Sequence, residues 1–291
     1  MIFRTRVLTL TSLAMLAFAG NSLLCRIALK DTSIDPATFT SVRLISGATA
    51  LWLIVSLRGA SHARAGSWAS AAALFVYAAA FSFAYVNLPA GTGALLLFGA
   101  VQATMILTGL WKGERLNARQ GIGLVIAMGG MVALVLPGLS APPLRSAVLM
   151  ASAGVAWGIY SLRGKGAGDP LAATVGNFLL SIPFTLVLSL SMLNDVRPDV
   201  AGIAYAIASG ALSSGVGYAI WYAALPGLRA TTAATVQLSV PVIAAIGGVL
   251  LVGEPITLRL LGASIAVLGG IALVVLRPKR AGRIGANSRP S

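Results

Sequence analysis

The sequence predicts an all-α integral membrane protein with ten transmembrane helices, arranged as two inverted repeats of five. Three observations predict this fold. The mean hydropathy is +0.90 and only 10% of the residues are charged, whereas soluble domains average roughly 25%. Ten apolar segments each reach the roughly 20 residues that a helix needs to cross a bilayer. Short motifs of the first half also recur in the second half.

The ten expected spans follow one another with short junctions of charged, Gly and Pro residues between them. The spans cover residues 7–27, 37–57, 67–87, 92–110, 119–137, 144–163, 171–191, 200–223, 231–251 and 258–276. The junctions are, in order, Lys30-Asp31, Arg58-Gly59, Leu88-Pro89, Lys112-Gly113-Glu114, Pro142-Pro143, Gly168-Asp169-Pro170, Arg197-Pro198-Asp199, Pro226-Gly227 and Gly253-Glu254-Pro255. We therefore expect one repeat over residues 1–140, a second over 141–276, and a basic tail over 277–291.

The first apolar run also resembles a signal peptide, because Arg4 and Arg6 precede it. It continues past Asn21 through Leu29, however, so we expect it to remain as the first span. Fifteen of the 21 basic residues fall on the side of the two termini, five fall on the other side, and Arg43 lies within a span. This bias predicts cytoplasmic termini in a bacterial inner membrane. The net charge of +14 is then a topology signal, and no nucleic-acid partner is expected.

Several motifs recur in one order along the chain. The matching pairs are Gly113-Glu114 with Gly253-Glu254, Gly129-Gly130 with Gly269-Gly270, Tyr85 to Pro89 with Tyr222 to Pro226, and Asp35-Pro36 with Asp169-Pro170. Since five spans are an odd number, the second repeat must be inserted upside down. Inverted repeats of this kind build many secondary transporters, whose substrate site lies near the membrane midplane between the halves.

The side chains available for chemistry are few. No Asp or Glu lies inside a span, which disfavours proton coupling through a buried acid. Cys25 is the single cysteine and His62 the single histidine, so neither a metal site nor a cofactor is expected. A nucleophile with an adjacent base cannot be assembled either, and the sequence gives poor support for an enzyme.

Arg43 is the one charged residue within a span, and it aligns with Asn177 of the second repeat. It lies roughly 10 Å into its helix at ~1.5 Å per residue, and an arginine at a helix centre costs at least about 2.5–3.5 kcal/mol. Two interpretations stay open. Arg43 is either a structural arginine that snorkels or binds backbone carbonyls, or an anion-facing residue near the outer mouth.

Aromatic and amide side chains within the spans are candidates to line a cavity, where they would contact a solute of mixed polarity. Lipid-facing aromatics and a structural kink at Pro241, which frees the carbonyl of Gln237, are the competing interpretations. The candidates are Asn21, Tyr77, Phe81, Gln102, Trp157, Tyr160, Tyr218, Gln237 and Ser239.

Two hairpins and two duplicated acids complete the candidate set. Pro89 and Gly91 lie in a hairpin expected outside, Pro226 and Gly227 in one expected inside, and each hairpin is predicted to close one end of the cavity. Glu114 and Glu254 are expected to pair with the nearby Arg119 and Arg259 at hairpin ends, with a transport role as the alternative. The small-residue stripes that include Gly123 and Gly270 predict helix packing, either within the halves or between protomers.

These duplicated motifs resemble the drug/metabolite transporter superfamily, EamA type, over residues 7–276. Within it, the chain is similar to amino-acid and metabolite exporters, including the YddG-type aromatic amino-acid exporters. The resemblance implies ten helices with a central cavity between two inverted five-helix halves, and transport by alternating access.

The sequence and the resemblance together predict a secondary transporter that exports small metabolites, with amino acids as the favoured substrates. Neutral side chains in the expected cavity favour aromatic and neutral amino acids, with broad selectivity. The alternatives are a nucleotide-sugar or phosphorylated-solute exchanger of the same superfamily, a membrane-embedded enzyme acting on lipid-linked substrates, and a non-transporting helper subunit. The expected partners are the small-molecule substrate and the lipid bilayer, with the protein a monomer or weak homodimer.

Overall fold

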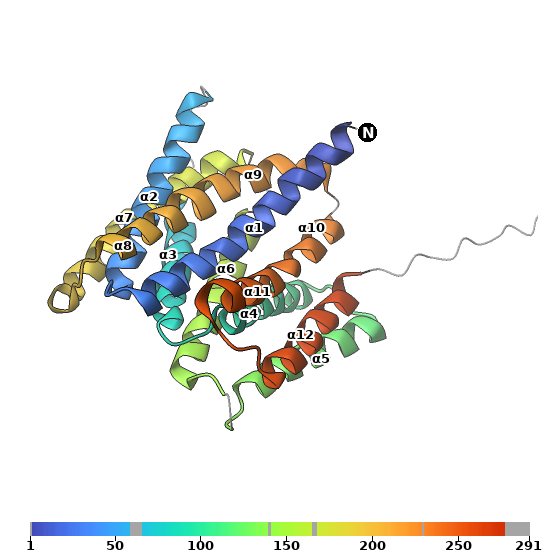
Figure 1. Ribbon diagram of the computed structural model, residues 1–291. Coiled ribbons are helices and arrows are strands. Elements are labelled where there is room, and N and C mark those ends of the chain that lie inside the picture. Colours follow the sequence, from blue (N-terminus) through green and yellow to red (C-terminus); the bar gives the residue numbers. More distant parts are fainter. Residues whose placement is uncertain (1, 59–65, 139–140, 165–167, 229, 277–291) are drawn as a thin grey trace, which may run out of the picture.

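The computed structural model describes residues 2–58, 66–138, 141–164, 168–228 and 230–276, and all secondary structure in these ranges is helical (Figure 1). The elements are α1 (Ile2–Asp31), α2 (Pro36–Leu57), α3 (Trp68–Tyr85), α4 (Ala90–Trp111), α5 (Ala118–Val135), α6 (Leu144–Gly164), α7 (Pro170–Ser191), η1 (Leu193–Asp195), α8 (Val200–Ile207), η2 (Ala208–Val216), α9 (Gly217–Ala224), η3 (Leu225–Gly227), α10 (Ala230–Gln237), α11 (Ser239–Val252) and α12 (Leu258–Val275). The loop that contains His62 and the basic tail 277–291 lie outside the described residues.

The described helices match an all-α membrane protein. Nine helical segments of the described residues are long and apolar enough to cross a membrane. The tenth expected span is α6, a helix of 21 residues whose more polar side chains include Trp157, Tyr160 and Ser161. The expected spans 200–223 and 231–251 are each interrupted in the structure, the first by the π-helical segment η2 and the second between α10 and α11.

The duplicated Asp-Pro pairs are helix-start signals. Asp35 accepts the N–H of Thr38 at 2.8 Å and caps α2, and Asp169 caps α7 through the same kind of bond. In both helices proline follows at the first position, where its missing N–H costs nothing. Asn117 and Gln120 form a reciprocal capping box at the start of α5. These caps fix where the spans begin.

Helices of the two halves pack against each other in a reciprocal pattern. α3 and α4 pack on α6, while α9 and α11 pack on α1. α2 packs on α7, and α5 lies beside α12 at one edge of the bundle (Figure 1). A Cβ added at Gly123 would lie 2.6 Å from the carbonyl oxygen of Gly270. These glycines therefore join α5 to α12 across the two halves of one chain, and the expectation of packing within the halves or between protomers is wrong for them.

The segment η2 is packed closely against α2. A Cβ added at Gly210 would clash with the carbonyl oxygen of Arg43 on α2, so the glycine lets the two backbones approach closely. The pattern of residues in the eighth span does not predict this segment. It turns Ser213 and Ser214 toward the interior of the bundle, where both line the cavity described below. π-Helical bulges are frequent at functional sites.

The bundle has two ends, which we name by the chain. The terminal face is the end where α1 begins and α12 ends, and the opposite face is the end where α1 ends and α12 begins. At the opposite face the N–H of Arg197 donates to Asp35 at 2.9 Å, and Ser33 donates to Asp199 at 3.2 Å. These bonds join the α1–α2 and α7–α8 junctions.

Both carboxyl groups are held in the ionised form. Burial raises the pKa of Asp35, but the N–H groups that donate to it outweigh this and lower the pKa below its usual value. The N–H of Gly202 and the hydroxyl of Ser33 lower the pKa of Asp199. Ionised carboxylates are therefore part of the opposite face.

Candidate substrate cavity

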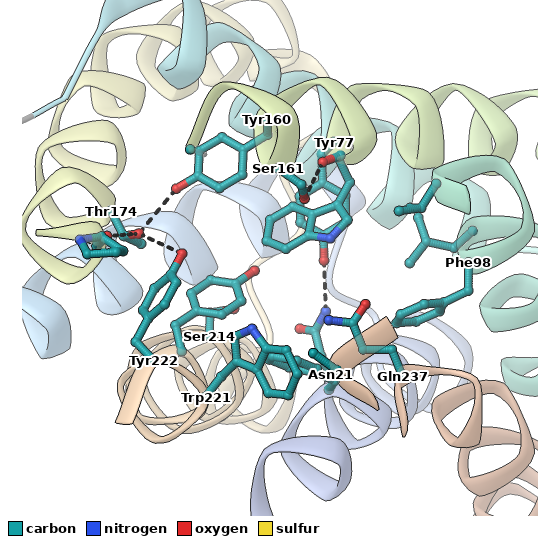
Figure 2. Close-up of a pocket in the computed structure, with 18 of the residues that line it drawn as sticks. Asn21, Tyr77, Phe98, Tyr160, Ser161, Thr174, Ser214, Trp221, Tyr222 and Gln237 are labelled. Carbon is teal, nitrogen blue, oxygen red and sulfur yellow. Dashed lines mark hydrogen bonds between the residues drawn. The ribbon is translucent and has the colours of Figure 1, made fainter. Parts of the chain in front are cut away.

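A cavity of about 490 Å³ lies between the two halves, within the usual size range of small-molecule sites. Side chains from α1, α3 and α4 line it on one side, and side chains from α6, α7, η2, α9 and α10 line it on the other. Figure 2 shows Tyr160 and Tyr222 converging on Thr174, with Asn21, Tyr77 and Gln237 in a second group. The cavity is where repeat-built transporters place their substrate.

An aromatic box surrounds Trp157. Its ring stacks on Tyr160 and Tyr218, with centroids 5.1 Å and 5.5 Å apart, and Tyr77 approaches it at 4.8 Å. Phe81 packs against Tyr77 and also lines the cavity. The structure thus brings all five aromatic candidates to the lining of one cavity, where they offer ring faces to a solute.

Three of the four polar candidates also line the cavity. Gln102 and Asn21 are buried lining residues, and Gln237 lies on the wall directly before the break between α10 and α11. The structure does not bring Ser239 to the wall. Its hydroxyl donates to the carbonyl of Val236 at 2.6 Å, because the helix break leaves that carbonyl free for a local partner.

A hydroxyl and amide cluster on α7 is a feature that the sequence does not predict. Thr174 bonds the hydroxyls of Tyr160 and Tyr222 at 3.4 Å and 3.2 Å, and Asn177 donates to Tyr160 at 3.4 Å. Thr174 also donates to the carbonyl of Pro170 within its own helix. Threonines in membrane helices commonly make this bond, so a threonine at this position does not by itself indicate a cavity residue. The alignment of Asn177 with Arg43 is the one signal that points to this position.

The cavity reaches the terminal face. Its lining includes Gly164, Pro170, Leu225 and Ala233, which are residues at or near the ends of α6, α7, α9 and α10 on that face. Toward the opposite face the lining stops at Ser22 on α1 and Phe81 on α3. The structure is therefore open toward one face of the bundle.

A group of polar contacts closes the opposite face one helical turn beyond Ser22 and Phe81. We call Arg26, Tyr85, Val86, Ala90 and Glu254 the latch. Arg26 Nε donates to Glu254 Oε1 at 2.7 Å, and Arg26 Nη1 donates to the carbonyls of Tyr85 and Val86 at 2.9 Å each. Glu254 Oε2 accepts the N–H of Ala90 at 2.7 Å. The latch ties α1 and the α3–α4 hairpin to the α11–α12 loop of the second half.

The expected pairing of Glu254 with Arg259 is wrong. Arg259 donates to the carbonyls of Leu134 and Leu136, and Glu254 pairs with Arg26, 228 residues away. Glu114 is exposed and forms no ion pair with Arg119 or any other described residue. Local spacing does not reveal the partner of Glu254, because that partner is set by the docking of α1 on α11.

The two Leu-Pro hairpins also differ in their surroundings, as the two glutamates do. Pro89 is the N-cap residue of α4 next to the latch, and a Cβ at Gly91 would lie 2.7 Å from Ala245 on α11. Pro226 and Gly227 are exposed at the terminal face, beside the open end of the cavity. One hairpin is thus packed against the second half, and the other borders an opening.

Arg43 does not lie at an open mouth. Its side chain is 2% exposed, and its guanidinium lies over the rings of Tyr77 and Phe81 at 5.1 Å and 4.8 Å. The expected outer-mouth position is therefore corrected, because the latch closes that end. In the described ranges no three His, Cys, Asp or Glu side chains gather as metal ligands would.

Comparison with known proteins agrees with this geometry. The model of the EamA-like transporter family matches the chain twice, over residues 5–136 and 144–276. The chain belongs to this family. It is therefore an EamA-family transporter and a multi-pass membrane protein.

Relatives extend the assignment. An uncharacterized protein of Pseudomonas aeruginosa is 60% identical over 97% of this chain and 99% of its own length. A protein of Streptantibioticus cattleyicolor named "Probable terminal-alkyne amino-acid exporter" is 26% identical over 68% of this chain and 69% of its own. The threonine/homoserine exporter RhtA of Escherichia coli is 29% identical over 47% of this chain and 48% of its own length. A crystal structure at 18% identity covers 93% of this chain and 97% of its own with a TM-score of 0.66, which shows the shared fold alone.

Proposed function

We propose that this EamA-family transporter exports neutral amino acids and similar small metabolites by alternating access. The observation that carries the proposal is the cavity itself. Ring faces, amides and hydroxyls line it, and none of the seven acidic residues and no Lys or Arg belongs to its described lining. Such walls suit a zwitterion whose two charges cancel, while its side chain contacts aromatic surface.

The proposed orientation gives the open end a role. With both termini in the cytoplasm, as the distribution of basic residues predicts, the terminal face is cytoplasmic and the latched opposite face is periplasmic. The described conformation then loads cargo from the cytoplasm. The reciprocal packing of the halves and the twofold match to the family model support two inverted repeats, 1–140 and 141–276.

Opening the opposite face requires the latch to break and the exposed hairpin at Pro226 and Gly227 to close over the terminal face. The names of the relatives support amino acids as cargo, since two of them are amino-acid exporters by name. No observation favours a nucleotide sugar or a phosphorylated solute, which would need several cationic side chains on the wall. We expect the protein to act in the bilayer as a monomer or weak homodimer.

Reconstitution tests the proposal. Purified protein is reconstituted into proteoliposomes whose interior holds unlabelled L-phenylalanine or L-threonine. Uptake of the labelled amino acid from outside is followed with and without an imposed pH gradient. We expect accumulation by exchange that protein-free liposomes lack, and no uptake of labelled nucleotide sugars. Flux of phosphorylated solutes alone, or no amino-acid flux in either direction, would overturn it.

A further inference from the structure

Arg43 is a buried cation without a carboxylate among the described residues around it. Its Nη2 donates to the Tyr77 hydroxyl at 2.9 Å, while Nε and Nη1 are buried and have no hydrogen-bond partner. The polar groups that face it from the neighbouring helices are Tyr77, Cys25 on α1 and Tyr218 on α9. All seven acidic residues lie at helix ends or in junctions, away from it. An arginine in a membrane span normally pairs with an anionic or carbonyl group. Because Arg43 has no such partner among the described residues, we expect its partner to be a group that binds and dissociates.

The guanidinium lies directly behind the cavity wall. Tyr77 and Phe81, whose rings it covers, both line the cavity at its closed end. The backbone of Arg43 is packed against Gly210 of η2. The positive charge can therefore act toward the cavity through a single layer of side chains.

The Tyr77 hydroxyl connects this charge to the cavity. Its oxygen accepts Nη2 of Arg43 and also Nδ2 of Asn21 at 3.2 Å. The Asn21 amide is held in this orientation because its oxygen accepts the Ser209 hydroxyl at 2.7 Å. With both lone pairs of the phenol oxygen engaged, its proton is left to donate, and no residue of the described ranges accepts it. Figure 2 shows the Tyr77–Asn21 bond at the cavity wall.

We propose that Arg43, Tyr77 and Asn21 form a carboxylate-binding end of the cavity. This inference rests on the proposed function and assigns the cargo its orientation. The Tyr77 hydroxyl and the Asn21 amide donate to the substrate carboxylate, and Arg43, acting through Tyr77, is the positioning residue that supplies the opposite charge. The aromatic box around Trp157 then receives the ammonium group and the side chain of the amino acid.

Binding to the purified full-length protein tests this assignment. The probes are L-phenylalanine and L-threonine, each compared with its carboxamide, together with phenylacetate, acetate and chloride, and Trp fluorescence or calorimetry gives Kd. We expect the protein to bind each amino acid at least about tenfold more tightly than its carboxamide, as the loss of a charge-assisted hydrogen bond predicts. In R43M this preference should fall to near unity, while R43K keeps most of it.

Arg259→Gln is the matched control, since it removes a cation that bonds backbone carbonyls of α5 away from the cavity. It should leave the acid-to-carboxamide ratio unchanged, whereas a loss of folding alone would weaken both ligands equally. Equal binding of acid and carboxamide by the unmodified protein overturns the inference even if R43M fails to fold. So does an unchanged ratio in folded R43M, or displacement by acetate or chloride at the concentrations at which phenylalanine acts.

The outcomes separate this inference from the proposed function. Amino-acid flux in proteoliposomes with no discrimination against the carboxamides refutes the carboxylate end alone. Tight binding of phenylacetate without binding or flux of any amino acid supports the carboxylate end and refutes amino-acid export.

Discussion

Glu254→Gln is expected to open the opposite face of the transporter, where the latch lies. The substitution removes the charge that Arg26 Nε meets at 2.7 Å, in a pair whose side chains are only 11% and 8% exposed. The glutamine oxygen can still accept the N–H of Ala90, but the amide NH2 then faces the Arg26 Nε–H as a second donor. At least one charge-assisted hydrogen bond is therefore lost, about 1.5–3 kcal/mol. If the latch forms only in this conformation, the equilibrium between the two states shifts by about tenfold to a hundredfold toward the one open at the opposite face.

Spin labels measure this shift. Val86 and Ile256 have exposed side chains on the two sides of the latch, so cysteines at these positions, in a Cys25→Ala background, report the distance across it. We expect the Glu254→Gln protein to show a longer-distance population that the parent lacks. Glu114→Gln is the matched control, because its carboxylate is exposed and forms no ion pair with any residue of the described ranges. Identical distance distributions in parent and Glu254→Gln, or equal opening in both variants, would refute the reasoning.

The cavity wall, the helix packing and the α2 cap each give a further prediction. Trp157→Ala should reduce amino-acid exchange at least about tenfold, since each aromatic contact is worth roughly 0.5–1.5 kcal/mol; proteoliposome flux measures it, and the exposed Trp111→Phe is the control. Gly123→Ala should lower the free energy of unfolding in detergent by about 1–3 kcal/mol, and with it the unfolding midpoint, because the added Cβ would meet the α12 backbone. A Cβ at Gly129 on the same helix meets nothing within 4 Å, so Gly129→Ala should be neutral. Equal midpoints for the two variants would contradict the packing. The pKa of Asp35 is lower in the folded protein than its ordinary value of 3.8, so its carboxylate stabilises the fold above that pH and the stabilisation is lost as pH falls through the folded pKa. Asp35→Asn should therefore melt lower at pH 7, with a difference that shrinks on acidification below about 4, and a difference independent of pH would count against this.

The predictable parts of this protein depend on local chemistry. Hydropathy sets the spans because each helix must cover the bilayer thickness by itself, and Asp35 and Asn117 cap helices through bonds that reach only three residues ahead. The aromatic candidates lie together because they share helix faces within apolar spans. Membrane helices have few polar side chains, so the aromatic and amide candidates are few, and eight of the nine cavity candidates line the cavity.

The parts that could not be predicted depend on docking between distant helices. η2 lies where Gly210 meets the backbone of α2. The hydrophobic periodicity of the eighth span does not predict this contact between the two helices. Glu254 takes a partner 228 residues away in place of the nearby Arg259. Ser239 bonds locally because the break before α11 frees a carbonyl. In each case the contact is decided by tertiary packing, which overrides the sequence neighbourhood.

The duplicated glutamates occupy different environments in the described conformation. Glu114 and Glu254 follow the same Gly in equivalent junctions, yet Glu254 is buried in the latch while Glu114 is exposed at the face where the cavity opens. Two inverted repeats of one sequence can exchange their environments with only a small difference in free energy, because the interactions that break at one face resemble those that form at the other. We therefore expect the asymmetry between the two glutamates to mark a single state, and we expect Arg43, which aligns with Asn177, to make the two ends of the cavity chemically different.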